Sequence, residues 1–219
     1  MNIAGVVINS LYVLTIASPF LEPYDHITVY YGKYLRSELK NGTEVDKVFV
    51  HKDFSSILNH KENDIALLKL KYEIQFNEDM RPICIFHSFY EEIHNTFTIA
   101  SFGSLSATKD GSLLATNMQE ISMYYVQLGT CKKTYPNYVF SFPYNLKTSK
   151  HICATSSERH VCRGDAGATL MLKYHKKMYA AGLLSFSRDL CTDTPAVFTN
   201  VGTFGKWIKD HTKDGKYCE

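Results

Sequence analysis

The sequence predicts an all-β fold, a barrel or a sandwich, on three observations. Short runs of apolar and β-branched residues recur along the chain at the length of strands. Turn signals separate them, and Asn41-Gly42 and Asp110-Gly111 mark hairpin ends. The 219 residues contain no repeat and no low-complexity tract, and their number suffices for two small β-barrels with buried cores.

Ten segments have the composition of strands. They are residues 6–8, 12–15, 27–31, 45–50, 65–70, 96–100, 121–126, 170–174, 179–184 and 196–201. The first two lie in an apolar stretch, residues 3–17, that could be taken for the core of a signal peptide. It lacks a basic leader and is interrupted by Asn9-Ser10, which favours two strands. Residues 206–213 predict a closing helix, amphipathic through Trp207 and Ile208.

Composition excludes several function classes. The formal net charge is +2, from 24 basic and 22 acidic residues without a long run of one sign, so neither nucleic acid nor an anionic membrane is an expected partner. No stretch reaches the ~20 apolar residues of a membrane span. No metal motif is visible, and residues 27–53 hold too few clustered acids for calcium, so no metal or other cofactor is expected.

Several motifs follow one another in a characteristic order. They are residues 5–17 (GVVINSLYVLTIA), 63–70 (NDIALLKL), 81–85 (RPICI), 162–170 (CRGDAGATL) and 194–201 (TPAVFTNV), with Trp207-Ile208 after them. Together they resemble the chymotrypsin- and trypsin-like serine protease family over residues 5–209. The resemblance implies one trypsin-like domain of two six-stranded-type antiparallel β-barrels: a truncated first barrel (residues 1–85), then a second barrel with a short C-terminal helix (residues 86–219).

The resemblance also places the catalytic triad of that family. Ser18 stands at the position of the base, Asp64 at that of the orienting acid and Ala166 at that of the nucleophile. In the hydrolytic mechanism an imidazole takes the proton of a serine hydroxyl while the aspartate orients the ring. Alanine cannot attack a carbonyl, and without an imidazole Asp64 has no ring to orient. The resemblance therefore implies a pseudoenzyme rather than a protease.

A substitute triad is not expected. The chain holds nine histidines, and Ser156 and Ser157 lie near the nucleophile motif. A nucleophile and its base must lie within hydrogen-bond reach of each other and beside an oxyanion site. Nothing in the geometry of the family brings a second histidine and serine together there.

The oxyanion hole of the family is made from backbone N–H groups, here those of Gly164 and Ala166. In relatives the loop becomes competent when a freshly cleaved, buried N-terminal ammonium pairs with the aspartate that matches Asp165. The chain is expected to begin after that activation site and after the opening strand. Asp165 is then expected to lack its partner, and the loop to be zymogen-like and mobile, because an unpaired buried carboxylate is costly.

The substrate pocket implied by the resemblance has also changed. His160 stands at its floor, where trypsin-like members have an aspartate, and an imidazole does not attract a substrate Lys or Arg. Ser185 begins the segment that pairs with substrate. Ser187 and Ala196 stand where many members have glycine, so the added atoms narrow the pocket.

Six cysteines indicate an oxidising compartment, and hence a secreted, extracellular protein, although this chain shows no convincing signal peptide. By motif position Cys131 pairs with Cys153, and Cys162 with Cys191. Cys84 and Cys218 remain. They either pair with each other or each await an absent partner, because in relatives the cysteine matching Cys84 often bonds to a prodomain.

Two further surface features follow from the sequence. Asn41 begins the only N-glycosylation sequon, in competition with a simple tight turn there. Residues 132–150 interleave lysines with aromatic residues, which is more typical of a helix and loop bracketed by a disulfide than of a partner surface.

The resemblance favours a secreted non-catalytic serine protease homologue. Such homologues act as decoys or scaffolds in invertebrate defence cascades and bind a protease, an inhibitor or a cascade cofactor. The alternative is an incomplete gene product of a serine endopeptidase, in which a missing barrel strand leaves ladder groups and core exposed. A working endopeptidase by another mechanism is the least favoured of the three classes.

Overall fold

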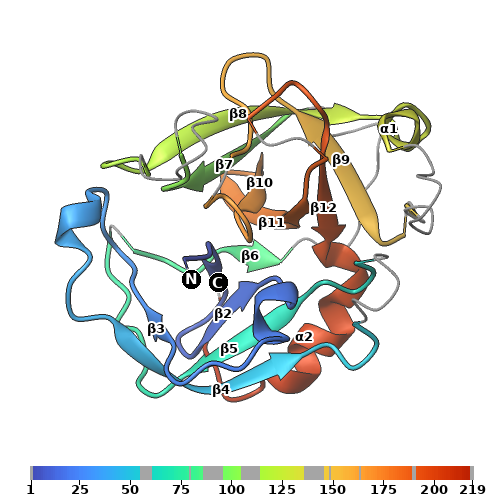
Figure 1. The fold of residues 1–219 in the computed structure, drawn as a ribbon. Helices are drawn as coiled ribbons and strands as arrows, with labels where there is room; N and C mark the ends of the chain where they lie inside the picture. The colour runs from blue at the N-terminus through green and yellow to red at the C-terminus, as the bar shows by residue number, and fades with distance from the viewer. Residues whose placement is uncertain are drawn as a thin grey trace.

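The computed structural model describes most of the chain, in two β-sheets that lie one above the other (Figure 1). The described residues are 2–54, 61–78, 80–85, 96–104, 114–135, 146–147, 149–162, 164–188 and 191–217. The fold is mostly β and chymotrypsin-like, as the sequence predicted, with a half-barrel followed by a closed barrel.

The half-barrel is a five-stranded antiparallel sheet in the order β1-β2-β5-β4-β3. Its strands are β1 (Val6–Val7), β2 (Tyr12–Thr15), β3 (Thr28–Val29), β4 (Thr43–Val50) and β5 (Ala66–Leu70). All four residues of β2 are buried, because apolar groups pack against both faces of this central strand. Two single 3₁₀ turns, Ser18–Phe20 and Arg36–Glu38, follow β2 and β3.

The second sheet has the order β10-β7-β8-β9-β12-β11-β6, and β10 also pairs with β11, which closes six antiparallel strands into a barrel. The strands are β6 (Cys84–Ile85), β7 (Thr96–Ser101), β8 (Gln119–Val126), β9 (His151–Thr155), β10 (Thr169–Tyr174), β11 (Lys177–Phe186) and β12 (Ala196–Asn200). β6 is the exception, since it joins β11 in parallel at the edge of the sheet.

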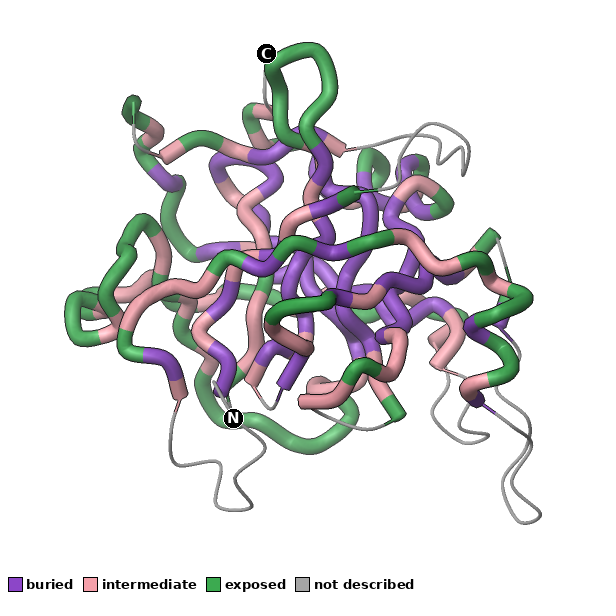
Figure 2. Tube along the Cα trace, turned by 90° about the horizontal axis from the view of Figure 1, so that it is seen from above, coloured by how far each residue is buried: buried purple, intermediate pink, exposed green. Residues whose placement is uncertain are grey.

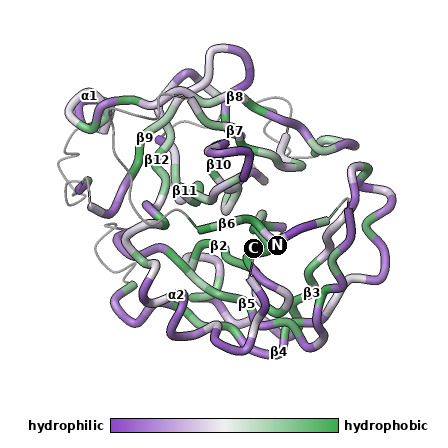
Figure 3. The backbone as a smooth tube through the Cα atoms, turned by 180° about the vertical axis from the view of Figure 1, so that it is seen from behind, coloured by the Kyte–Doolittle hydropathy of each residue, from purple (hydrophilic) through white to green (hydrophobic). Residues whose placement is uncertain are grey.

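One apolar cluster joins the two sheets. It contains Ile8 and Leu14 from the first sheet, Leu183 from β11, and Phe204 and Ile208 from the C-terminal end of the chain. Buried segments of the chain gather in the interior of the molecule (Figure 2), and β6 and parts of β2 and β5 carry hydrophobic residues (Figure 3). Burial of this much apolar surface fixes the two halves against each other.

The helices are short. The 3₁₀ helix Val201–Phe204 continues directly into α2 (Gly205–His211), which runs from the end of β12 back onto the first sheet (Figure 1). α1 (Leu128–Thr134) follows β8 and buries Cys131 against β9. The predicted helix at residues 206–213 is therefore present with slightly earlier bounds. α1 overlaps the segment predicted as helix and loop, residues 132–150, only at residues 132–134, and most of the remainder of that segment lies outside the described residues.

Each of the ten predicted strands overlaps an observed strand, with ends that differ by a few residues at most. β6 and β9 were not predicted. Asn41 and Gly42 lie directly before β4, at the end of the loop from β3, whereas the second turn signal, Asp110-Gly111, lies outside the described residues.

A buried histidine in β9 couples the stability of this barrel to pH. His151 is 4 % exposed, and its Nδ1 accepts the backbone N–H of Lys147 at 3.1 Å. Burial lowers the pKa of His151 to about 4, so the ring is neutral near pH 7. Because the unfolded ring has a pKa near 6.5, the stability that the neutral ring contributes is present above that pH and is lost as the pH falls towards 4.

We predict that His151→Asn removes this component of acid sensitivity. The asparagine carbonyl can still accept the Lys147 N–H, but it does not titrate. The free energy of unfolding should be measured by urea denaturation from pH 7 to pH 4. The wild-type protein should lose up to about 3 kcal/mol relative to the variant over this range. Curves that stay parallel would show that His151 is not the titrating group.

Candidate site at the junction of the two sheets

A buried carboxylate lies where the two sheets meet. Asp64 precedes β5 and is 0 % exposed. Its Oδ1 accepts the backbone N–H groups of Ala17 at 2.8 Å and Ser18 at 2.7 Å, both in the segment directly after β2. Its Oδ2 accepts the hydroxyls of Ser18 at 3.2 Å and of Ser185, from β11, at 2.6 Å. Four donors from both sheets therefore converge on one carboxylate.

These donors offset the cost of burying Asp64. Burial raises the pKa of the Asp64 carboxyl, while the hydrogen bonds from Ser185 and Ser18 and the positive charge of Lys61 act in the opposite direction. The Lys61 ammonium also lies 3.4 Å from the backbone carbonyl oxygen of Ser185. The hydroxyl of Thr199, in β12, donates to the Asp64 carbonyl oxygen at 2.9 Å and fixes its backbone as well.

Ala166 lies in a tight turn between Cys162 and β10. Gly164 and Gly167 on either side of it have φ angles of +91° and +82°, which side chains rarely adopt. The Ala166 carbonyl oxygen accepts the N–H of Ala4 at 2.8 Å, and the Gly167 N–H donates to Leu184 at 2.9 Å. The turn is thus anchored to the N-terminal segment and to β11.

The chemistry that this group of residues offers is limited. Ser18 and Asp64 are in contact, as the sequence resemblance implies for the base and acid positions. Ala166 contributes only a methyl group and its backbone. Ser156, considered above as a substitute nucleophile, is buried, and its hydroxyl lies 3.4 Å from the N–H of Glu158. The site therefore contains a carboxylate, hydroxyls and backbone N–H groups, and the roles assigned to them remain predictions.

The predicted pocket residues lie in different environments. Ser185 and Ala196 are buried, and Ala196 pairs with Ala154 between β12 and β9. Ser187 and His160 are half-buried, and the buried Nδ1 of His160 has no hydrogen-bond partner among the described residues. Their roles in a specificity pocket stay predictions.

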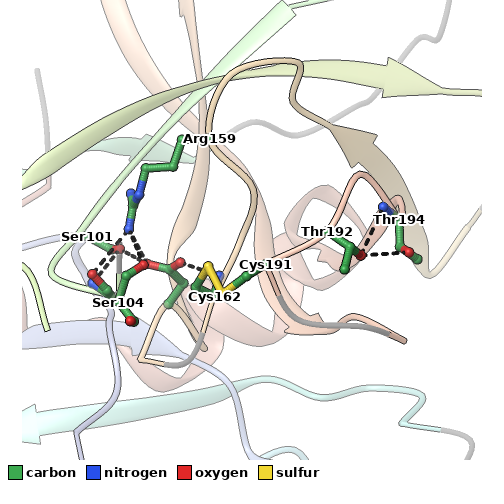
Figure 4. The surroundings of a disulfide bond; sticks show 9 residues. Ser101, Ser104, Arg159, Cys162, Cys191, Thr192 and Thr194 are labelled. Carbon is green, nitrogen blue, oxygen red and sulfur yellow. Dashed lines mark hydrogen bonds and ion pairs between the residues drawn. A yellow bond between two sulfur atoms is a disulfide. The ribbon is translucent and has the colours of Figure 1, made fainter. Parts of the chain in front are cut away.

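Asp165 corrects one expectation from the sequence. It was expected to lack a partner, yet it is 0 % exposed and both of its carboxylate oxygens accept hydrogen bonds. Its carboxylate accepts the Ser101 hydroxyl and, at 2.6 Å, the Cys162 N–H, and it lies 3.8 Å from Nη2 of Arg159 (Figure 4). The motif located Asp165 correctly, but its partners Ser101 and Arg159 belong to no motif, so sequence reasoning missed them.

Comparison with known proteins decides the family. The family model described as Trypsin matches residues 3–208. The chain belongs to the trypsin family. A relative described as phenoloxidase-activating enzyme, from Bombyx mori, is 24 % identical over 172 residues, which cover 76 % of this chain and 39 % of that protein. The chain therefore spans well under half the length of this relative.

Two disulfides of the trypsin-family domain were implied by the resemblance and are present. Cys131–Cys153 joins α1 to β9, and Cys162–Cys191 joins the turn before Ala166 to the segment before β12. Cys84 is also in a disulfide, whereas Cys218, one partner considered for it, lies outside the described residues. Disulfides of this kind are consistent with an extracellular protein.

Other features complete the description of this trypsin-family domain. Asn41 is exposed and has a φ of +56°, so it is accessible as the glycosylation candidate. Within the described residues, no helix has the length and apolar character needed to cross a membrane. The same residues contain no group of three His, Cys, Asp or Glu side chains that could hold a metal ion.

The contact between Gly103 and Asp165 generates a prediction. A Cβ atom at Gly103 would overlap the Asp165 carboxylate. We expect Gly103→Ala to lower the free energy of unfolding by about 1–3 kcal/mol, because a buried charged group must shift to admit the methyl group. Chemical denaturation monitored by tryptophan fluorescence measures the change.

Gly129→Ala is the matched control. Gly129 lies in α1, and a Cβ atom there would meet nothing within 4 Å. Alanine should stabilise this helix by up to about 1 kcal/mol. Equal effects of the two substitutions would contradict the packing around Asp165.

Proposed function

We propose that this trypsin-family domain is a secreted, non-catalytic homologue that holds a polypeptide of a proteolytic cascade without cutting it. The supporting observation is the contact between Ser18 and Asp64. A hydroxyl occupies the hydrogen-bonding position on the carboxylate that an imidazole base requires in this family. Peptide hydrolysis through an acyl intermediate also needs a side-chain nucleophile, and Ala166 has none.

Ser18 itself is a poor substitute for the nucleophile. Its hydroxyl donates to Asp64, a carboxylate that already accepts three other hydrogen bonds. Burial raises the pKa of Asp64 and these donors oppose that rise. Because they also occupy both carboxylate oxygens, the carboxylate is poorly placed to remove a proton from a hydroxyl. Peptide binding is retained more easily than catalysis, because the backbone groups that bind a peptide do not depend on the side chains at positions 18 and 166.

The partner proposed is an extended polypeptide segment at the end of β11. The register between β11 and β12 shifts between Leu184 and Phe186, which leaves Ser185 out of the ladder. Its carbonyl oxygen accepts a hydrogen bond from Lys61 Nζ at 3.4 Å and, with its second lone pair, can also accept one from an added strand. Lys61, whose Nζ lies 3.4 Å from that oxygen, favours a segment with an acidic side chain nearby.

We predict that the wild-type protein does not react with a fluorophosphonate probe, because Ala166 has no hydroxyl and the Ser18 hydroxyl donates to a carboxylate rather than to an imidazole. Intact mass spectrometry after incubation with excess probe should detect no adduct, while an active trypsin treated in parallel is labelled fully. Stoichiometric labelling of the wild-type protein would refute the proposal.

Two variants test whether the missing base or the missing nucleophile prevents reaction with the probe. Ala166→Ser alone should remain unlabelled, since the new hydroxyl has no imidazole to take its proton. Adding Ser18→His to it supplies the base beside Asp64, and slow labelling is expected. Labelling of the single Ala166→Ser variant would indicate a base other than the one proposed.

A second prediction tests the binding half of the proposal. The Bombyx mori relative is described as an enzyme that activates phenoloxidase. If the two domains share a ligand class, this protein in excess should lower the initial rate at which that enzyme activates phenoloxidase. Lys61→Glu should weaken that effect by placing a like charge against an acidic segment. An unchanged activation rate, with no complex in sedimentation, would contradict polypeptide binding here.

A further inference from the structure

The side chain of Asp165 links the turn at Ala166 to the end of β7. It is fully buried, and burial raises its pKa. An ionised carboxylate in such a place needs both hydrogen bonds and a compensating charge. The surroundings of Asp165 therefore determine whether this turn keeps one conformation.

Neutral donors satisfy part of this need. The hydroxyl of Ser101, at the end of β7, donates to Oδ1, and the N–H of Cys162 donates to Oδ2 at 2.6 Å. The backbone N–H of Gly103 bonds to Asp165 and lies 3.2 Å from the Ser101 hydroxyl oxygen. These contacts place the carboxylate against the segment that follows β7, but none of them carries a positive charge.

Arg159 supplies that charge. Its Nη2 lies 3.8 Å from Oδ1 of Asp165 and donates to the carbonyl oxygens of Gly103 at 3.2 Å and Ser104 at 3.1 Å (Figure 4). The Arg159 side chain is 18 % exposed, so solvent screens the ion pair less than it screens a surface pair. One guanidinium nitrogen thus links the carboxylate to the segment after β7.

In the described part of the chain, the other two nitrogens of the guanidinium lack such hydrogen bonds. Nε and Nη1 of Arg159 are buried and have no hydrogen-bond partner among the described residues. Buried donors without acceptors are costly. The attraction to Asp165 offsets this cost, and the two residues therefore depend on each other.

The turn held by this pair presents free donors. The N–H of Asp165 bonds to Cys162 at 3.1 Å, and the N–H of Ala168 bonds to Asp165 at 2.8 Å. Within the described part of the chain, the N–H groups of Gly164 and Ala166 have no acceptor. Their direction depends on the backbone between Cys162 and Ala168, and hence on the side chain of Asp165.

We propose that Arg159 is a positioning residue: its guanidinium provides the counter-charge that holds Asp165, and with it the turn whose Gly164 and Ala166 N–H groups receive a ligand's acceptor oxygen. The inference rests on the proposed function for the identity of that ligand, a polypeptide carbonyl. The pair is formed entirely within residues 159–165, so ordering of the turn does not require a cleaved amino terminus.

Hydrogen–deuterium exchange of the isolated domain tests this inference without a partner. Arg159→Met retains the length of the side chain and removes the charge. Peptides covering residues 162–168 should exchange on the order of tenfold faster in this variant or more, while those from β4 and β5 should be unchanged. Arg188→Met is the matched control, since Arg188 is exposed and donates to Thr134 in α1. It should leave residues 162–168 as they are in the wild-type protein.

A double variant separates counter-charge from simple packing. If Arg159 acts by compensating the charge of Asp165, then Arg159→Met with Asp165→Asn should restore slow exchange, because no buried charge remains. Arg159→Lys should give intermediate exchange, as it keeps the charge but loses the planar donor. This series remains informative if Arg159→Met alone does not fold.

Two results would overturn the inference. One is wild-type exchange of residues 162–168 in Arg159→Met. The other is a double variant that does not restore slow exchange, or that does not fold when Arg159→Met does not fold either. In both cases Arg159 would act through its hydrogen bonds to Gly103 and Ser104 rather than through its charge. Failure of polypeptide binding would refute the proposed function and leave these exchange results intact.

Discussion

The two sheets of this protein are joined through a buried carboxylate. Asp64 accepts hydrogen bonds from Ala17 and Ser18 at the end of one sheet and from Ser185 in the other. Ionised groups in protein interiors are stable only when their surroundings replace the water that they lose. Four neutral donors do so here, and the charge of Lys61 acts in the same direction, so the junction does not need an imidazole. Serine at position 18 is compatible with the fold because its own hydroxyl completes the set.

Asp165 poses the same problem and is stabilised differently. Its donors come from Ser101 and Cys162, and Arg159 adds a compensating positive charge 3.8 Å away. Neutral donors act over short distances and fix an orientation, whereas a cation also offsets the free energy of burying the charge itself. The Asp64 end of the site is therefore sensitive to the loss of the hydroxyl groups that donate to it. The Asp165 end is sensitive to the loss of one positive charge, that of Arg159.

Sequence patterns predicted the β-architecture because alternation and apolar runs report burial directly. They failed for β6, which is two residues long, and for β9, where residues 151–155 combine a histidine, a cysteine and a threonine with only two aliphatic residues. Both strands form because backbone groups of neighbouring strands pair with them: β11 with β6, and β8 and β12 with β9. The motif around Asp165 gave its position, but not its environment. Ser101 is 64 residues away, and only the folded barrel brings it to the carboxylate.

Under the proposed function, the site binds a polypeptide without cutting it because the two activities use different atoms. Hydrolysis would need side-chain atoms at positions 18 and 166, where the chain has Ser18 and Ala166. Binding of an extended segment would use the carbonyl of Ser185 and the N–H groups of Gly164 and Ala166. These three groups belong to the backbone, so on this proposal they stay in place as long as Asp64 and Asp165 remain bonded. Under the proposed function, the interactions that keep these carboxylates in place are also those that keep the binding surface formed.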